Sequence, residues 1–218
     1  MDTEDAVALD AQNKELTDSI IKGDGDRAAK SAIEISHHRE HVNDIVDTIS
    51  DAMNIVADLH EIDPYPVEKM ESCEQAAEKA LQAIRHKIRI EQSKIVGRVM
   101  VTSLKGDPHN FDKTLLMTML EIGGFTPLDG GTDMEPNEVI RKVAEMRPDV
   151  LAIPLVSSSA AKNLLETASL IVAQKPKPHV VAYGRGMAEL PLEPGFGAVE
   201  EDSLAALSRI AELLIARQ

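Results

Sequence analysis

The sequence predicts two structural units: a four-helix bundle over residues 1–92 and an α/β unit with a five-stranded parallel sheet over residues 93–218. Up to about residue 90, apolar residues recur at intervals of three and four, and no segment is rich in β-branched residues. After that point, short β-branched runs alternate with segments of helical periodicity. Such alternation indicates a parallel sheet with helices on both of its faces.

The first unit shows its helical period most clearly in Ile45, Val46, Ile49, Met53 and Val56. Turn-forming stretches divide this half at residues 22–26, 36–41 and 61–66. The last of the resulting helices is expected to run from residue 67 to about residue 89. These segments predict a small helical bundle.

The second unit is expected to hold strands at 96–102, 125–129, 150–155 and 179–183, and helices at 112–122, 135–147, 160–174 and 203–217. Pro136 suits the first turn of its helix, where a missing N–H costs little. In sheets of this kind, ligands bind at the carboxyl ends of the strands. The loop after the first strand, which carries His109, is therefore expected at the binding edge.

The composition narrows the possible partners. A net charge of -14 and an isoelectric point near 4.9 argue against a nucleic-acid or anionic-membrane surface, which needs clustered Lys and Arg. Cys73 is the single cysteine, so an internal disulfide cannot form. No apolar run approaches the roughly 18 residues of a membrane span, and the first ten residues are acidic, unlike a signal peptide. We therefore expect a cytoplasmic protein.

Several interpretations compete for the loop "GDPHNFD" at residues 106–112. In the first interpretation, the loop is only a strand-to-helix turn, because Gly, Asp, Pro and Asn form turns and Asp112 is a good N-cap. A phosphoacceptor receiver would need an aspartate at the end of the third strand, where Pro154, Leu155 and Val156 stand. A nucleotide-binding fold would need a glycine-rich phosphate motif, which the sequence lacks.

A further interpretation uses His109. A loop imidazole is a good ligand for a transition metal, and a carboxylate two residues away, here Asp107, can fix its tautomer. No second histidine or cysteine lies nearby in the sequence, so the metal would have to bring its other ligands. The run His37, His38 and His41 is a rival metal cluster, although a solvated histidine run explains it more simply.

Gly106, Asp107, His109 and Lys113 match the motif G-D-x-H-D-I-G-K-N, in which D-x-H-x-x-G is the signature. In these residues the chain resembles the corrinoid (cobalamin-binding) proteins of methyltransferase systems, whose domain also occurs in methionine synthase. Further segments extend the resemblance over most of the chain. Residues 20–35, 44–61 and 67–84 resemble the helical cap domain, and residues 121–153 resemble the second strand and the approach to the third.

The resemblance implies a Rossmann-like (flavodoxin-like) B12-binding domain behind a helical cap, with cobalamin as cofactor. It implies a methyl carrier that accepts a methyl group on cobalt(I) from a substrate-specific methyltransferase and presents methylcobalt(III) to a second methyltransferase. A reductive activation protein is a further expected partner. In this scheme His109 is the lower ligand of cobalt and Asp107 is its hydrogen-bonding partner. The chain would be a carrier subunit rather than a self-sufficient enzyme.

The resemblance also implies a groove for the nucleotide tail of the cofactor. This groove would run beside the first helix of the α/β unit, between the Asp107 loop and the ends of the third and fourth strands. The helical bundle would cover the upper face of the cofactor. The residues expected to contact cobalamin are Tyr65, Met70, Asp107, Pro108, His109, Asn110, Phe111, Asp112, Pro154, Ser157, Ser158, Tyr183, Gly184 and Gly186.

The chain departs from the motif at several of these positions. Asp112 replaces the signature glycine, and Pro154 replaces a serine that contacts the benzimidazole of the tail. Tyr183 and Arg185 interrupt a Gly-Gly-Ala segment. Asp112 and Pro154 favour an alternative function, in which a degenerate relative with lost or altered cobalamin binding acts as a regulatory or interaction module.

Simpler structural roles stay open for other candidates. Gly184 and Gly186 can relax a turn, and the serines at 157–159 can cap the helix that follows. Tyr65 and Met70 stand at a spacing that is also typical of core residues.

Overall fold

The computed structural model describes residues 3–38, 43–62, 66–87, 97–107, 109–187 and 198–215. The chain divides into two compact units, Met1–Arg89 and Ile90–Gln218. Within the described residues, no helix combines the length and apolar character that crossing a membrane requires.

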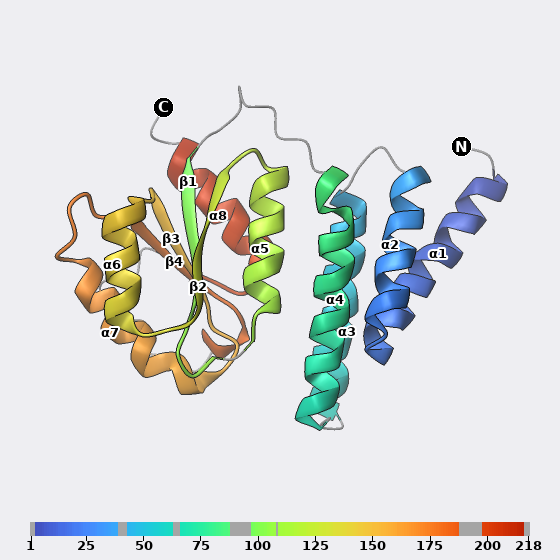
Figure 1. Ribbon diagram of the computed structural model, residues 1–218, viewed down its shortest axis with the longest axis horizontal. Helices are drawn as coiled ribbons and strands as arrows, with labels where there is room; N and C mark the ends of the chain where they lie inside the picture. Colours follow the sequence, from blue (N-terminus) through green and yellow to red (C-terminus); the bar gives the residue numbers. More distant parts are fainter. Residues whose placement is uncertain are drawn as a thin grey trace. The chain divides into compact units, whose positions relative to one another are not determined.

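The regular structure described in the first unit is helical (Figure 1). They are α1 (Thr3–Lys22), α2 (Gly25–His38), α3 (Asn43–Ile62) and α4 (Val67–Ile84), followed by the short η1 (Arg85–Lys87). The predicted break at 36–41 begins too early, because α2 continues through His38. The hydroxyl of Ser36 donates to the carbonyl oxygen of Ile33 at 2.6 Å, so this turn-forming side chain is satisfied inside the helix.

The second unit contains a parallel sheet whose strands follow the order β2-β1-β3-β4-β5. The strands are β1 (Arg98–Leu104), β2 (Thr126–Met134), β3 (Val150–Pro154), β4 (His179–Tyr183) and β5 (Ala198–Glu200). The predicted α/β class with a parallel sheet is confirmed. The sequence pattern did not locate β5, because three residues are too few to show a strand period.

Helices cover both faces of this sheet (Figure 1). They are α5 (Phe111–Ile122), α6 (Pro136–Met146), α7 (Ala161–Ile171) and α8 (Ser203–Ile215). Because side chains alternate along a strand, neighbouring residues enter different cores. One core joins Met100 and Leu151 with Val139 of α6 and Leu164 of α7. The second core joins the sheet with α5 and α8 and contains Val99, Val101, Leu116, Ala152, Val181, Tyr183 and Ile210.

The predicted start of α5 and the predicted bounds of α7 differ from the structure. The prediction of Asp112 as N-cap is wrong, because α5 already begins at Phe111 and its N-cap is Asn110. The carbonyl oxygen of Asn110 accepts from Thr114 N at 3.0 Å, which starts the helical hydrogen bonds two residues earlier than a cap at Asp112 would. The predicted helix at 160–174 is shorter, since a 3-10 turn, η3 (Ser158–Ala160), precedes α7 and α7 ends at Ile171.

Candidate functional site

Asp107 connects two loops at the carboxyl edge of the sheet. Its side chain lies in the β1–α5 loop, and the residue is 1% exposed. Oδ2 accepts hydrogen bonds from Val156 N at 2.6 Å and Ser157 N at 3.2 Å, both in the loop after β3. Oδ1 accepts from His109 N at 3.4 Å. Hydrogen bonds of this kind offset the cost of burying a carboxylate, so Asp107 fixes the path of both loops.

Other contacts hold the same loop from the side of η3 and α7. The hydroxyl of Ser159 donates to the carbonyl oxygen of Gly106, and Asn163 Nδ2 donates to Lys105 O at 2.7 Å. Gly106 has φ +90, a left-handed conformation that strongly favours glycine. The positive φ of Gly106 and the hydrogen bonds from Ser159 and Asn163 therefore fix the turn that precedes His109.

His109 is half-buried, and it lies between Asp107 and the N-cap residue Asn110. Its backbone N–H donates a hydrogen bond to Asp107, which positions the His109 backbone at the carboxyl edge of the sheet. The part of the chain that the structure describes contains no group of three or more His, Cys, Asp or Glu residues that could hold a metal ion. A single imidazole serves as a metal ligand when the other donors arrive with the metal.

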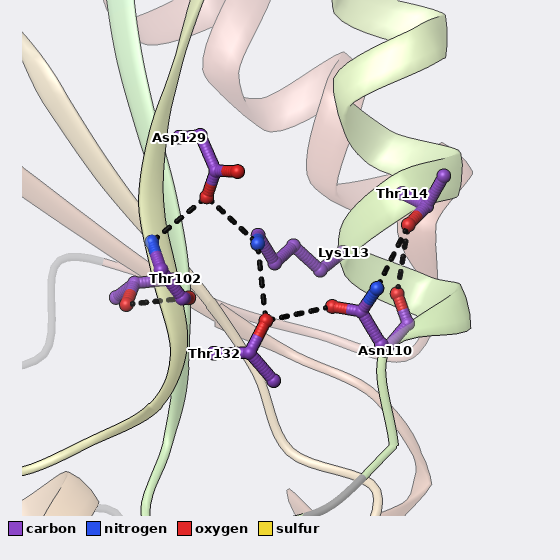
Figure 2. Close-up of polar contacts among 7 residues, drawn as sticks. Thr102, Asn110, Lys113, Thr114, Asp129 and Thr132 are labelled. Carbon is purple, nitrogen blue, oxygen red and sulfur yellow. Dashed lines mark hydrogen bonds and ion pairs between the residues drawn. The ribbon is translucent and has the colours of Figure 1, made fainter.

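A polar network anchors the first turn of α5, directly after His109 (Figure 2). The side chain of Lys113 is 6% exposed, and its Nζ lies 2.7 Å from Asp129 Oδ1 on β2. Nζ also donates to Thr132 Oγ1 at 3.2 Å, and Thr132 Oγ1 donates to Asn110 Oδ1 at 3.0 Å. Burial by itself would raise the pKa of Asp129, but hydrogen bonds from Lys113 and Gly131 and the charge of Lys113 lower it below its ordinary value.

The side chain of Asn110 closes this network on α5. Its Nδ2 donates to Thr114 Oγ1 at 3.3 Å, and Thr114 Oγ1 donates back to Asn110 O at 3.1 Å (Figure 2). The contacts of Asn110 thus reach both β2 and α5. They fix the residue that follows His109 in the chain.

Tyr183 crosses from the end of β4 to the start of α5. It is 0% exposed, and its hydroxyl donates to the carbonyl oxygen of Asp112 at 3.0 Å. In the sheet it pairs with Pro154, the last residue of β3. Burial first, and the negative charge of Asp112 second, raise the pKa of the Tyr183 phenol well above its ordinary value.

The two glycines after β4 allow the chain to pack closely on the end of β3. A Cβ atom on either Gly184 or Gly186 would lie 2.8 Å from the carbonyl oxygen of Leu155. Gly184 has φ +109, and Gly186 N donates to Leu155 O at 2.9 Å. This packing accounts for both glycines within the protein itself.

Most of the predicted site residues gather at one edge of the second unit. Phe111 and Pro154 are buried there, whereas Asp112 is half-buried and Ser158 is exposed. Ser157 Oγ caps η3 by accepting from Ser159 N at 3.3 Å. Met70 belongs to α4 of the first unit, where it is half-buried. Tyr65, Pro108 and His41 lie outside the described residues.

Sequence reasoning missed two features of this edge. One is the partnership of Lys113 with Asp129 and Thr132, which no local pattern announces because the partners are 16 and 19 residues away. The other is Ser103 near the end of β1, whose Oγ is buried and has no hydrogen-bond partner in the described part of the chain. A serine in the strand "RVMVTSL", otherwise mostly apolar, is the signal that could have found it.

Part of the chain is similar in sequence to known proteins. No protein-family profile matches the chain. A trimethylamine corrinoid protein of Methanosarcina barkeri is 32% identical over 78 residues, which are 36% of this chain and 36% of the relative. Trimethylamine corrinoid protein 2 of Methanosarcina mazei is 31% identical over 78 residues, with the same coverage. This chain is a relative of the corrinoid proteins. The resemblance seen in the sequence is thereby confirmed, although the match spans only about a third of those relatives.

The fold agrees with that relationship. The structure of the Methanosarcina barkeri monomethylamine corrinoid protein matches with a TM-score of 0.73, covers 91% of this chain and 96% of that chain, and is 19% identical. A cobalamin-binding protein from Desulfitobacterium hafniense matches with a TM-score of 0.50 at 15% identity, over 94% of this chain and 98% of that chain. At such identities the likeness establishes the fold alone.

The residues present fit a corrinoid only in part. His109, on an anchored loop at the binding edge, suits a lower axial ligand. The groove expected for the nucleotide tail does not fit, because the buried side chain of Tyr183 spans from β4 to α5 where this groove would run.

Proposed function

We propose that this chain binds a corrinoid at the carboxyl edge of its sheet, with His109 as the lower ligand of cobalt. The observation that carries the proposal is the anchoring of His109 N to Asp107, a carboxylate that is 1% exposed and is itself held by Val156 N and Ser157 N. A ligand residue whose backbone is already fixed loses less conformational freedom when it binds.

In this proposal the chain carries a methyl group between a substrate-specific methyltransferase and a second methyltransferase. A reductive activation protein is a further proposed partner. A corrinoid, when bound, supplies the cobalt that accepts and gives up the methyl group. The protein supplies the ligand, the orientation and the exclusion of water. We place this carrier in the cytoplasm.

Asp107 orients the ligand loop in this proposal. Tyr65 and Met70, in the first unit, are further proposed contacts of the corrinoid. The lower side of the site is formed by Pro108, Asn110, Phe111, Asp112, Pro154, Ser157, Ser158, Tyr183, Gly184 and Gly186.

A binding experiment tests the proposal. The purified chain is incubated with aquacobinamide, a corrinoid without a nucleotide tail, and unbound corrinoid is removed by gel filtration. We expect visible corrinoid absorbance to elute with the protein at close to one equivalent. Elution of colourless protein would reject the proposal, provided that its circular dichroism and melting transition show a folded chain.

A second candidate function is a regulatory or interaction module that has given up corrinoid binding. The observation that favours it is the contact of Tyr183 with Asp112 O, which fills the expected tail groove with protein. If the protein retains neither aquacobinamide nor hydroxocobalamin in the same gel-filtration experiment, the result would support this function instead.

A further inference from the structure

The contact between Tyr183 and Asp112 closes one face of the sheet at its carboxyl edge. The phenol ring belongs to the core between the sheet, α5 and α8, together with Leu116 and Val181. Its hydroxyl ends on the carbonyl oxygen of Asp112, in the first turn of α5. The groove expected for a nucleotide tail runs beside this helix and between the ends of β3 and β4. Tyr183 therefore occupies the space that the tail would need.

Ser103 lies on the same face of the sheet. Val99 and Val101 of β1 belong to the core that contains Tyr183, and by strand alternation the side chain of Ser103 points to that side. Its Oγ is buried, and within the described residues it has no hydrogen-bond partner. A buried hydroxyl without a partner costs free energy, and a polar ligand group or a water molecule that reached it would remove this cost.

We infer that Tyr183 is a specificity-determining residue, and that it makes the site favour a corrinoid without a nucleotide tail over cobalamin. This inference rests on the proposed function, because it assumes that the edge around His109 binds a corrinoid. The ring of a tail-free corrinoid needs His109 but does not need the groove that Tyr183 fills. A corrinoid with an inserted tail has to displace the phenol.

Displacement of Tyr183 is costly for identifiable reasons. The hydrogen bond to Asp112 O is broken, and a ring that is 0% exposed leaves its core. The backbone cannot easily yield, because Leu155 N donates to Tyr183 O at 2.8 Å and the following Gly184 packs against Leu155. Once the ring has moved, we expect the tail to reach Ser103, which lies on the same face of the sheet.

Equilibrium titrations of the full chain with aquacobinamide and hydroxocobalamin test the inference. In the wild type we expect aquacobinamide to bind at least about tenfold more tightly. In Tyr183→Ala we expect hydroxocobalamin to gain affinity, so that the preference falls to within about threefold. Tyr183→Val, which suits a strand, provides a second shortened side chain if the alanine variant does not fold.

Three further variants separate an effect on the groove from general loosening of the core. Val181→Ala also enlarges this core, but two residues away from the end of β4, and should leave the preference unchanged. Tyr183→Phe keeps the ring and loses only the hydroxyl, and should change the preference less than Tyr183→Ala. Ser103→Ala, added to Tyr183→Ala, should lower the affinity for hydroxocobalamin and leave aquacobinamide unaffected.

The outcomes distinguish this inference from the proposed function. If both corrinoids bind the wild type equally, or if Tyr183→Ala leaves a tenfold preference intact, the inference is overturned while the proposed function stands. The second result would mean that competition between benzimidazole and His109 for cobalt sets the preference. Failure of the wild type to bind either corrinoid would overturn both.

Discussion

Asp107 Oδ2 lies 2.6 Å from Val156 N and accepts its hydrogen bond, which joins the loop after β1 to the loop after β3. The residues are 49 positions apart in the chain. Because the carboxylate is 1% exposed, water contributes little to its stabilisation, and the backbone N–H groups have to do so. The place of His109 therefore depends on Asp107.

Asp107→Asn should destabilise the second unit. An amide keeps one acceptor oxygen, but it has no charge and turns an NH₂ group toward backbone donors that need an acceptor. We expect the free energy of unfolding to fall by about 1–3 kcal/mol, as measured by urea denaturation.

Asp133→Asn is the matched control for this substitution. Asp133 is exposed, accepts a 3.3 Å hydrogen bond from Gly106 N, and has φ 55, which Asn tolerates well. We expect a change below about 0.5 kcal/mol. Equal losses in both variants would contradict the structural role assigned to Asp107.

Lys113→Met should also destabilise the second unit, because it removes the ammonium that joins Asp129 and Thr132 to the start of α5. The stem of Met fills most of the space, so the loss reports the polar contacts. We expect about 1–3 kcal/mol by urea denaturation at neutral pH. Lys105→Met breaks the exposed ion pair with Glu135 and should cost less than Lys113→Met does. The reverse order would show that the Lys113 network adds no stability.

Tyr183 should titrate above the ordinary phenol range. The chain has two tyrosines and no tryptophan, so Tyr65→Phe leaves Tyr183 as the single source of tyrosinate absorbance. Because this pKa is raised, the Tyr183 phenol stays protonated to a higher pH in the folded state than in the unfolded state. Stability is therefore full below about pH 10 and falls as the pH rises toward the raised pKa. A reversible titration of Tyr183 at the ordinary value in folded protein would contradict its burial.

Asp112→Gly separates helix stability from cofactor binding. In the first turn of α5 the carboxylate favours the helix by about 0.3–1 kcal/mol, and glycine adds a cost of about 1 kcal/mol. The apo protein should therefore melt at a lower temperature. Against the phosphodiester of a tail about 6 Å away, the same charge repels by roughly 3 kcal/mol at an effective dielectric of about 20. Hydroxocobalamin should bind the variant more tightly and aquacobinamide equally. Unchanged hydroxocobalamin affinity would mean that the tail does not pass Asp112.

The fold was largely predictable because its elements are long enough to show a period. The helices of the first unit follow from apolar spacing, and β3, which is buried throughout, follows from a short continuous run of apolar residues. The start of α5 was misplaced because Asn and Asp are both good N-cap residues, and only the backbone conformation chooses Asn110.

The site was predictable only where its residues are close in sequence. Asp107 and His109 form a recognisable local motif. The backbone donors of Asp107 could not be foreseen, since Val156 N and Ser157 N are present whatever side chain stands there. The contact of Tyr183 with Asp112 joins residues 71 positions apart and depends on the strand order.

The most direct test of the central claim is the paramagnetic resonance spectrum of cobalt(II) cobinamide bound to the wild type and to His109→Ala. Because cobinamide has no benzimidazole, coupling to a nitrogen outside the corrin ring can come only from the protein. We expect superhyperfine coupling to one nitrogen in the wild type and its loss in His109→Ala. His179→Ala, at the opposite end of β4 from Tyr183, should keep the coupling. The same nitrogen coupling in His109→Ala, or none in the wild type, would contradict the assignment of His109 as the cobalt ligand.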